Sequence, residues 1–288
     1  MAIMRPEPTP VSGIPRAIAY GLIHRAHSAW TRRRYRASFE EVKRFCLFVG
    51  YPRSGHSIVG AVLNAHRSAV ISHELIVPPL ILGGCDRDGL YAQIIARANW
   101  FNLRGNRTNY RYGIPGQWQG RFRSLRVIGD KRGGTVTLTL ETDPDLLQRT
   151  RILTQVPLRL IHVIRNPWDN IAAISIWHKL TPEASADFYF RHWRVTDRLG
   201  EFASSEEVLA IHHEDFIEWP RETIAALCSH LDLELYPGYL ADCCAVLFDR
   251  PTYTRRKIDW SPELLASVAE RVAQYPLLKR YAFELPKR

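Results

Sequence analysis

The chain has 288 residues, of which 46% are hydrophobic and 24% are charged, an ordinary globular composition that supports a sizeable core. Its formal net charge of +10 at pH 7 favours polyanionic partners: nucleic acid, a phosphorylated nucleotide, an acidic glycan or an anionic membrane. No apolar run reaches the length of about 18 residues that a membrane span needs, so none is expected.

The five cysteines are an odd count with no CxxC pair. They indicate neither a disulfide framework nor a zinc site. Free, buried thiols are therefore expected, which suits a cytoplasmic location.

The N-terminal part of the chain is expected to change character at residue 15. Residues 1–15 contain four prolines and are expected to be disordered, whereas residues 16–288 are expected to form one domain. A helix is expected over about 16–35, and the basic cluster 31–36 lies at its end. The cluster could make a peripheral contact with lipid headgroups or an acidic partner, or it could be a solvated surface.

Short apolar runs alternate with helical patterns through the rest of the chain. The run Arg44–Val49 ends in a Gly/Pro turn, as a buried parallel strand does, and helical spacing follows over 57–66. Further strands are expected at 126–131, 158–164 and 208–213, and further helices at 143–153, 168–179 and 220–231. This order predicts an α/β fold of the P-loop type, with three layers (α/β/α) and a central parallel sheet.

The alternation breaks down between residues 83 and 125. Over residues 97–123, six aromatic residues are interleaved with six arginines. We interpret this segment as an insertion that lies over the strand ends.

The segment Gly50–Ser57 reads G-x-x-x-x-G-H-S, which is the Walker A frame with His56 at the position of the lysine. It follows an expected strand and opens an expected helix, where backbone N–H groups and the helix dipole favour an anion. Gly55 lets the backbone approach a phosphate closely. The segment therefore predicts a phosphate-binding turn, but one that lacks the lysine of an ATPase or kinase and carries Arg53 instead.

The turn resembles the 5′-phosphosulfate loop of the sulfotransferases that use 3′-phosphoadenosine-5′-phosphosulfate (PAPS). Their loop reads Pro-Lys/Arg-Ser-Gly-Thr-Thr/Ser, and Pro52–Ser57 matches it except at His56. The match is closest to the tyrosylprotein and carbohydrate branches. The resemblance implies that PAPS is the co-substrate, that no metal is required, and that the turn binds PAPS through a consecutive set of residues: Arg53, Ser54, Gly55, His56 and Ser57.

A second part of the resemblance lies in residues 160–175. In the family a strand ends in Arg-Asn/Asp-Pro, and the arginine, here Arg165, binds the 3′-phosphate. A serine usually follows eight residues later, but that position is Ala173. Ser175 is a candidate, although two residues turn a helix by about 200°, which leaves its contact in doubt.

Two further segments carry candidate nucleotide contacts. His213 stands at the tyrosine position of the family's Tyr-Glu-Asp-Leu/Phe segment, where it could contact the adenine or be an ordinary strand-end residue. The segment 254–260 resembles the family's Arg-Lys-Gly…Asp-Trp segment without its glycine. Arg256 and Lys257 are therefore candidates for the 3′-phosphate, and a solvated basic run is the alternative.

The resemblance also implies residues for the reacting centre. Arg53 would neutralise charge on the leaving phosphate, and Lys131 would share this task. Glu74 lies 21 residues after Arg53, which matches the catalytic glutamate of the tyrosylprotein branch. His73 is the competing base, because the unperturbed pKa of histidine is about 6.5. In a third alternative, neither residue is the base.

The function expected from these residues is in-line transfer of a sulfuryl group from PAPS to a hydroxyl or amine of a small-molecule, glycan or peptide acceptor. A P-loop kinase or NTPase is one alternative, with Asp130 as a possible metal ligand. A non-enzymatic nucleic-acid-binding protein is another, but it depends on charge alone, so no specific nucleic acid is expected.

Overall fold

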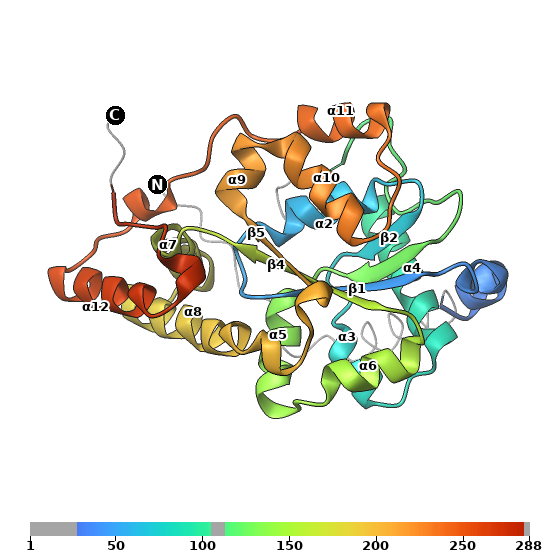
Figure 1. The fold of residues 1–288 in the computed structure, drawn as a ribbon, viewed down its shortest axis with the longest axis horizontal. Helices are drawn as coiled ribbons and strands as arrows, with labels where there is room; N and C mark the ends of the chain where they lie inside the picture. Colours follow the sequence, from blue (N-terminus) through green and yellow to red (C-terminus); the bar gives the residue numbers. More distant parts are fainter. Residues whose placement is uncertain (1–27, 105–112, 285–288) are drawn as a thin grey trace, which may run out of the picture.

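The computed structural model describes residues 28–104 and 113–284 (Figure 1). Within these ranges five strands form one parallel sheet in the order β2-β3-β1-β4-β5. The strands are β1 (Arg44–Val49), β2 (Ala69–Ser72), β3 (Val127–Asp130), β4 (Leu158–Ile164) and β5 (Val208–His212). The predicted α/β fold with a central parallel sheet is confirmed.

Strand β1 is central because its side chains are buried on both faces. Phe45, Leu47 and Val49 join the core on one face, whereas Cys46 and Phe48 join the core on the other. Phe45 pairs with Ile128 of β3 on one side and with Leu158 of β4 on the other. The strand order therefore reverses at β1, and parallel sheets bind ligands at the carboxyl ends of strands beside such a reversal.

Helices cover both faces of the sheet, which gives the three expected layers (Figure 1). One face carries α2 (His56–Asn64), α9 (His213–Glu218), α10 (Pro220–His230) and α11 (Pro237–Ala245). The other face carries α3 (Val77–Leu82), α4 (Arg87–Arg104), α5 (Gly133–Thr142) and α6 (Leu146–Thr154).

A third apolar cluster lies beyond the carboxyl ends of the strands (Figure 1). It joins α7 (Pro167–His178), α8 (Pro182–Asp197) and α12 (Pro262–Ala273) around buried aromatic side chains such as Trp168 and Trp193. These helices face the edge of the sheet where β1 and β4 end. They form the outer wall of the candidate site.

The segment 83–125 was expected to be an insertion over the strand ends, but much of it forms helix α4. Leu90, Tyr91, Ile94 and Ile95 of this helix are all buried in the core. Their spacing is helical, but the arginines and aromatic residues that follow in the sequence obscure it. These buried residues belong to the helical layer on one face of the sheet, whereas Arg97 and Phe101, later in α4, contact His73 directly after the end of β2. Residues 105–112 are outside the described part.

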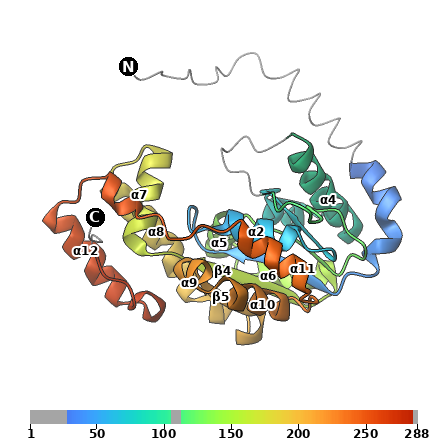
Figure 2. The same ribbon diagram turned by 90° about the horizontal axis from the view of Figure 1, so that it is seen from above.

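The N-terminal expectations are tested only in part. Residues 28–39 are helical, and Thr31 and Phe39 anchor this helix in the protein. It lies at the opposite end of the molecule from α12 (Figure 2). In the basic cluster, Arg32 donates to Asp86 at 2.8 Å. Residues 1–15, expected to be disordered, lie outside the described residues.

Two further expectations concern cysteines and membranes. All five cysteines are free; Cys46, Cys228 and Cys243 are buried, whereas Cys85 and Cys244 are partly exposed. Among the described residues, no helix has the length and apolar character needed to cross a membrane.

Candidate active site

A cavity of about 860 Å³ opens where β1 and β4 end. Its walls bring together predicted residues from six separate segments of the chain. They are Arg53, Gly55, His56, Ser57, Glu74, Lys131, Arg165, His213 and Lys257. Ser54, His73, Ser175 and Arg256 are not among the residues that line this cavity.

The turn between β1 and α2 adopts the conformation of an anion-binding site. Gly50, Arg53 and Gly55 all have positive φ, of 117°, 70° and 111°. A Cβ atom on Gly55 would lie 2.2 Å from Cδ2 of His213, so the His213 ring packs directly on the turn. None of the described side chains caps the N-terminus of α2, so its first N–H groups remain for an anion. Ser54 is buried and braces the turn by donating to the Tyr51 carbonyl at 3.2 Å.

His56 differs from a Walker lysine in charge as well as in shape. Its Nε2 lies 3.1 Å from the Val49 carbonyl oxygen, which can only accept, so Nε2 carries the proton and Nδ1 is bare. Burial, followed by the nearby charge of Lys131, lowers the pKa of His56 to about 3. The side chain is therefore neutral and supplies neither a cation nor a free N–H to a phosphate.

Lys131 joins the turn to the candidate base. Its Nζ donates to Ser57 Oγ at 2.7 Å and to Glu74 Oε1 at 3.0 Å. Arg132, which the sequence analysis did not select, donates from Nη1 to Glu74 Oε2 at 2.9 Å. Its position directly after a strand-end lysine was the available signal.

The same two cations control the ionisation of Glu74. Burial would raise the pKa of this carboxyl group, but the charge and hydrogen bond of Lys131, with His73 and Arg132, lower it to about 2. Burial in turn lowers the pKa of Lys131, and Glu74 opposes that change. Glu74 also has a positive φ of 60°, a costly conformation that is concentrated at functional sites.

Asp130 holds the chain that carries Glu74. Its Oδ1 accepts from Ser72 Oγ at 2.7 Å and from the Leu75 N–H at 2.9 Å. The carboxylate is buried and does not line the cavity. Its placement gives no support to a metal ligand for a bound triphosphate.

His73 is not among the residues that line the cavity. Its ring stacks on Phe101 with 3.8 Å between centroids. Burial, followed by Lys131, lowers the pKa of His73 to about 3. Between the two candidate bases, only Glu74 borders the cavity.

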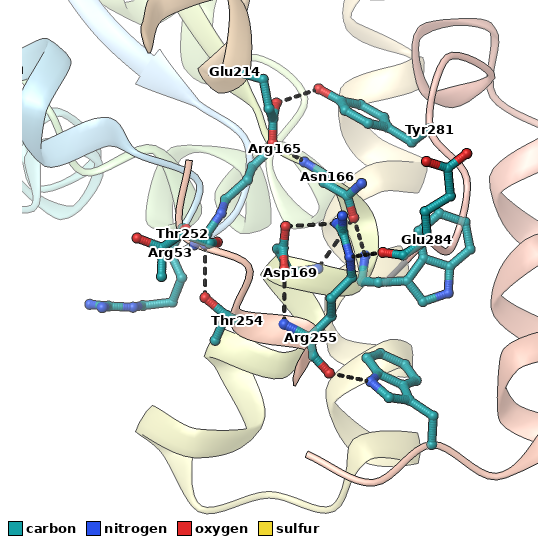
Figure 3. A network of polar contacts seen from close by, with 12 residues as sticks. Arg53, Arg165, Asn166, Asp169, Glu214, Thr252, Thr254, Arg255, Tyr281 and Glu284 are labelled. Atoms are coloured by element: carbon teal, nitrogen blue, oxygen red, sulfur yellow. Dashed lines mark hydrogen bonds and ion pairs between the residues drawn. The ribbon is translucent and has the colours of Figure 1, made fainter. Parts of the chain in front are cut away.

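Arg165 links the turn to the C-terminal part of the chain (Figure 3). Its Nη1 donates to the Arg53 carbonyl at 3.1 Å, and its Nη2 donates to the Thr252 carbonyl and to Thr254 Oγ1, both at 2.9 Å. Asn166 then caps α7 by accepting the N–H groups of residues 168 and 169. A guanidinium thus lies beside the turn, at the position expected for a second phosphate.

The basic segment 254–257 has a buried and an exposed part. Arg255 is buried and donates to Asp169 Oδ2 at 2.8 Å, which fixes the 3₁₀ turn Thr254–Lys257 (Figure 3). Lys257 lines the cavity, whereas the exposed Arg256 lies 5.8 Å from the ring centroid of Tyr253. The structure therefore brings Lys257 to the site and leaves Arg256 outside it.

Ser175 does not replace the serine that the family pattern has at position 173. Its hydroxyl donates to the Leu180 carbonyl at 2.8 Å, at the end of α7. Ala173 lines the cavity instead. The helical rotation between the two positions explains why the predicted Ser175 contact is not supported.

Trp177 is a site residue that the sequence analysis missed. The Arg53 guanidinium carbon lies 4.1 Å from the centroid of its ring, which favours a cation–π contact. Trp177 follows Ala173 by one helical turn, so the phase of α7 was the available signal. The contact keeps the Arg53 side chain at the cavity wall.

Comparisons with known proteins found no matching protein-family model and no matching curated protein. Solved structures do resemble the chain. The sulfotransferase domain of the Synechococcus PCC 7002 olefin synthase is 15% identical with a TM-score of 0.48, over 85% of this chain and 97% of that one. Sulfotransferase STF9 from Mycobacterium avium is 12% identical with a TM-score of 0.49, over 91% and 83%. Mouse sulfotransferase SULT7A1, complexed with PAP, is 13% identical with a TM-score of 0.45, over 85% and 93%. At these identities the likeness to sulfotransferases is one of fold.

Proposed function

We propose that the chain is a sulfotransferase that moves a sulfuryl group from PAPS to a hydroxyl or amine acceptor. The observation that carries the proposal is the bridge made by Lys131, from Ser57 of the phosphate turn to the carboxylate Glu74. It unites an anion site, a cation and a base in one cavity.

Arg165 supports a donor with two separated phosphates. The N-terminus of α2 with Lys131 would form one anion position, and Arg165, which donates to Thr254, would form a second beside it. PAPS carries a 5′-phosphosulfate and a 3′-phosphate, which would fit these positions. A triphosphate fits less well, because His56 is neutral where the Walker lysine would contact the β- and γ-phosphates.

For a hydroxyl acceptor, the proposed step exchanges one sulfur–oxygen bond for another. The bond from sulfur to the 5′-phosphate oxygen breaks, the bond from sulfur to the acceptor oxygen forms, and the acceptor proton passes to Glu74. Arg53 and Lys131 would stabilise the negative charge on the leaving phosphate. A carboxylate whose pKa is about 2 is a weak base. Movement of Lys131 from Glu74 toward the donor would raise that pKa and strengthen the base.

Calorimetry with adenosine 3′,5′-bisphosphate and with Mg²⁺-ATP tests the cofactor class. We expect the bisphosphate to bind in preference to ATP, and Arg165→Ala to weaken its binding. Arg149→Ala is the matched control, because Arg149 is exposed and its nearest carboxylate oxygen is 3.9 Å away. Preference for ATP would support a kinase or NTPase, and salt-sensitive RNA or DNA binding without bisphosphate binding would support a nucleic-acid-binding protein.

A further inference from the structure

The cavity extends to both sides of the phosphate turn. One end is lined by residues of α9 and of the segment 248–257, and the other by residues of α5 and α8. Helices α9 and α5 lie on opposite faces of the sheet (Figure 1). The second end, called the α5–α8 arm here, is formed by Leu138, Thr139, Thr142, Phe188, Arg191 and His192.

The charge of the cavity is concentrated around the turn and not in the arm. Arg53, Lys131, Arg165 and Lys257 all line the part that would hold the donor. PAPS carries about four negative charges, since its phosphosulfate contributes two and its phosphate monoester up to two. The donor would therefore engage all four of these cations, of which Lys131 is also paired with Glu74.

The cations near the acceptor are already paired. Arg132 donates to Glu74 at 2.9 Å. Arg191 of the α5–α8 arm donates from Nε and Nη2 to Oε2 of Glu141 on α5, at 2.9 and 2.7 Å. Each guanidinium is thus already neutralised by a carboxylate, so an anionic acceptor gains less there than it would at an unpaired cation.

The surface of the arm is apolar with hydrogen-bond acceptors. The rings of Phe188 and His192 lie 4.6 Å apart, and Leu138 is also in the wall. Thr139 uses its hydroxyl proton on the Thr135 carbonyl at 2.8 Å, so its oxygen is left to accept. Burial lowers the pKa of His192, whose Nδ1 donates to the Phe188 carbonyl at 2.9 Å, and its neutral Nε2 can accept as well.

We infer that the acceptor is an uncharged, hydroxyl-bearing ring compound, such as a phenol or an alicyclic alcohol. This rests on the proposed sulfotransferase function and narrows it. The ring would pack against Leu138 and Phe188, and a hydroxyl would donate to the oxygen or nitrogen acceptors of the arm. Acidic tyrosine peptides and carboxylated polysaccharides are disfavoured because the arm holds no unpaired cation among its described residues.

The test separates donor binding from acceptor choice. Binding of adenosine 3′,5′-bisphosphate is measured first, and its absence would refute the sulfotransferase function itself. With that nucleotide bound, 2-naphthol is then titrated against an acidic tyrosine peptide and a carboxylated polysaccharide, and transfer of labelled sulfuryl from PAPS is followed for each. We expect 2-naphthol to bind and to be sulfated best. Failure of 2-naphthol to bind the nucleotide complex, or better transfer to either anion, would overturn the inference.

Two variants test the pairing of charge in the arm. Glu141→Gln leaves Arg191 without its carboxylate, so we expect at least a several-fold gain in transfer to the acidic peptide relative to 2-naphthol. Glu201→Gln is the control, because it removes a comparable pair with Arg198 on the exposed surface. Affinity for adenosine 3′,5′-bisphosphate should stay unchanged in both, which reports intact folding. Equal acceptor preference in the two variants would contradict the inference.

Discussion

Replacement of Glu74 by Gln removes one negative charge from the reacting centre and changes the shape of the side chain very little. If Glu74 accepts the proton of the acceptor, turnover should fall by a factor of ~10²–10⁴, the usual contribution of a general base. This corresponds to about 3–5 kcal/mol in the activation free energy. Nucleotide affinity should not fall, because the lost charge is negative and lies beside cations that would bind the donor.

The cost in stability should be much smaller than the cost in turnover. The lowered pKa of Glu74, from 4.5 to about 2, would correspond to roughly 3 kcal/mol for a fully shielded group. Its side chain is 39% exposed, however, so solvent screening reduces this to about 1 kcal/mol. The free energy of unfolding from a denaturant titration measures this change directly.

Single-turnover transfer of labelled sulfuryl, with 2-naphthol as the first acceptor, separates chemistry from binding. Glu40→Gln is a suitable control, since Glu40 is an exposed carboxylate paired with Arg87 far from the cavity. His73→Asn should retain most of its turnover, because its ring stacks on Phe101. Full turnover in Glu74→Gln would refute the assignment of the base, and loss of turnover in His73→Asn alone would transfer the role to His73.

Three further predictions concern the nucleotide and the buried histidines. Arg165→Ala should raise the dissociation constant of adenosine 3′,5′-bisphosphate by ~10–100-fold in calorimetry, since a charge-assisted hydrogen bond contributes about 1.5–3 kcal/mol; an unchanged constant would remove Arg165 from the site. Gly55→Ala should lower the melting temperature and abolish nucleotide binding, because its φ is 111° and its new methyl group would meet the His213 ring at 2.2 Å; wild-type binding would contradict this packing. His162 is buried, and burial lowers its pKa from 6.5 to about 3. Between these pH values the unfolded chain therefore binds more protons at His162 than the folded chain does. The contribution of neutral His162 to the free energy of unfolding is complete above pH 6.5 and falls as the pH drops toward 3. Denaturant titrations at several pH values measure the slope, which should become shallower in His162→Gln; an identical slope would refute the assignment.

The fold was predictable where the sequence carries one clear pattern. Strands β1 and β4 are continuous apolar runs that end in glycine or Arg-Asn-Pro turns, which identified their direction and burial. Strand β2 was missed although β3, which is equally short, was predicted; the available signal was the apolar run at 69–71, shortly after α2. Helix α4 was missed because the whole segment was interpreted from its aromatic and arginine residues, and not from the helical spacing of the aliphatic residues at its start.

The candidate site was predictable as far as strand ends define it. Lys131 and Arg165 directly follow β3 and β4, Arg53 lies in the turn after β1, and parallel strands bring such residues to one edge. Positions within helices or short turns were harder. Whether Ser175 faces the cavity depended on the phase of α7. Which of Arg255, Arg256 and Lys257 lines the cavity depended on which of them pairs with the buried Asp169.

His56 also restricts which residues can follow Lys131 and Arg132. Gly133 begins α5 so close to the turn that a Cβ atom there would lie 2.6 Å from Cε1 of His56 and 3.0 Å from the Val49 carbonyl carbon. Position 133 therefore cannot take a larger residue while His56 and the backbone at Val49 keep their places, although 77 residues of sequence separate positions 56 and 133. A lysine introduced at position 56 would enter this enclosed space and lose the hydrogen bond to Val49. Conversion of the turn to triphosphate chemistry would thus require at least the start of α5 to be rebuilt as well.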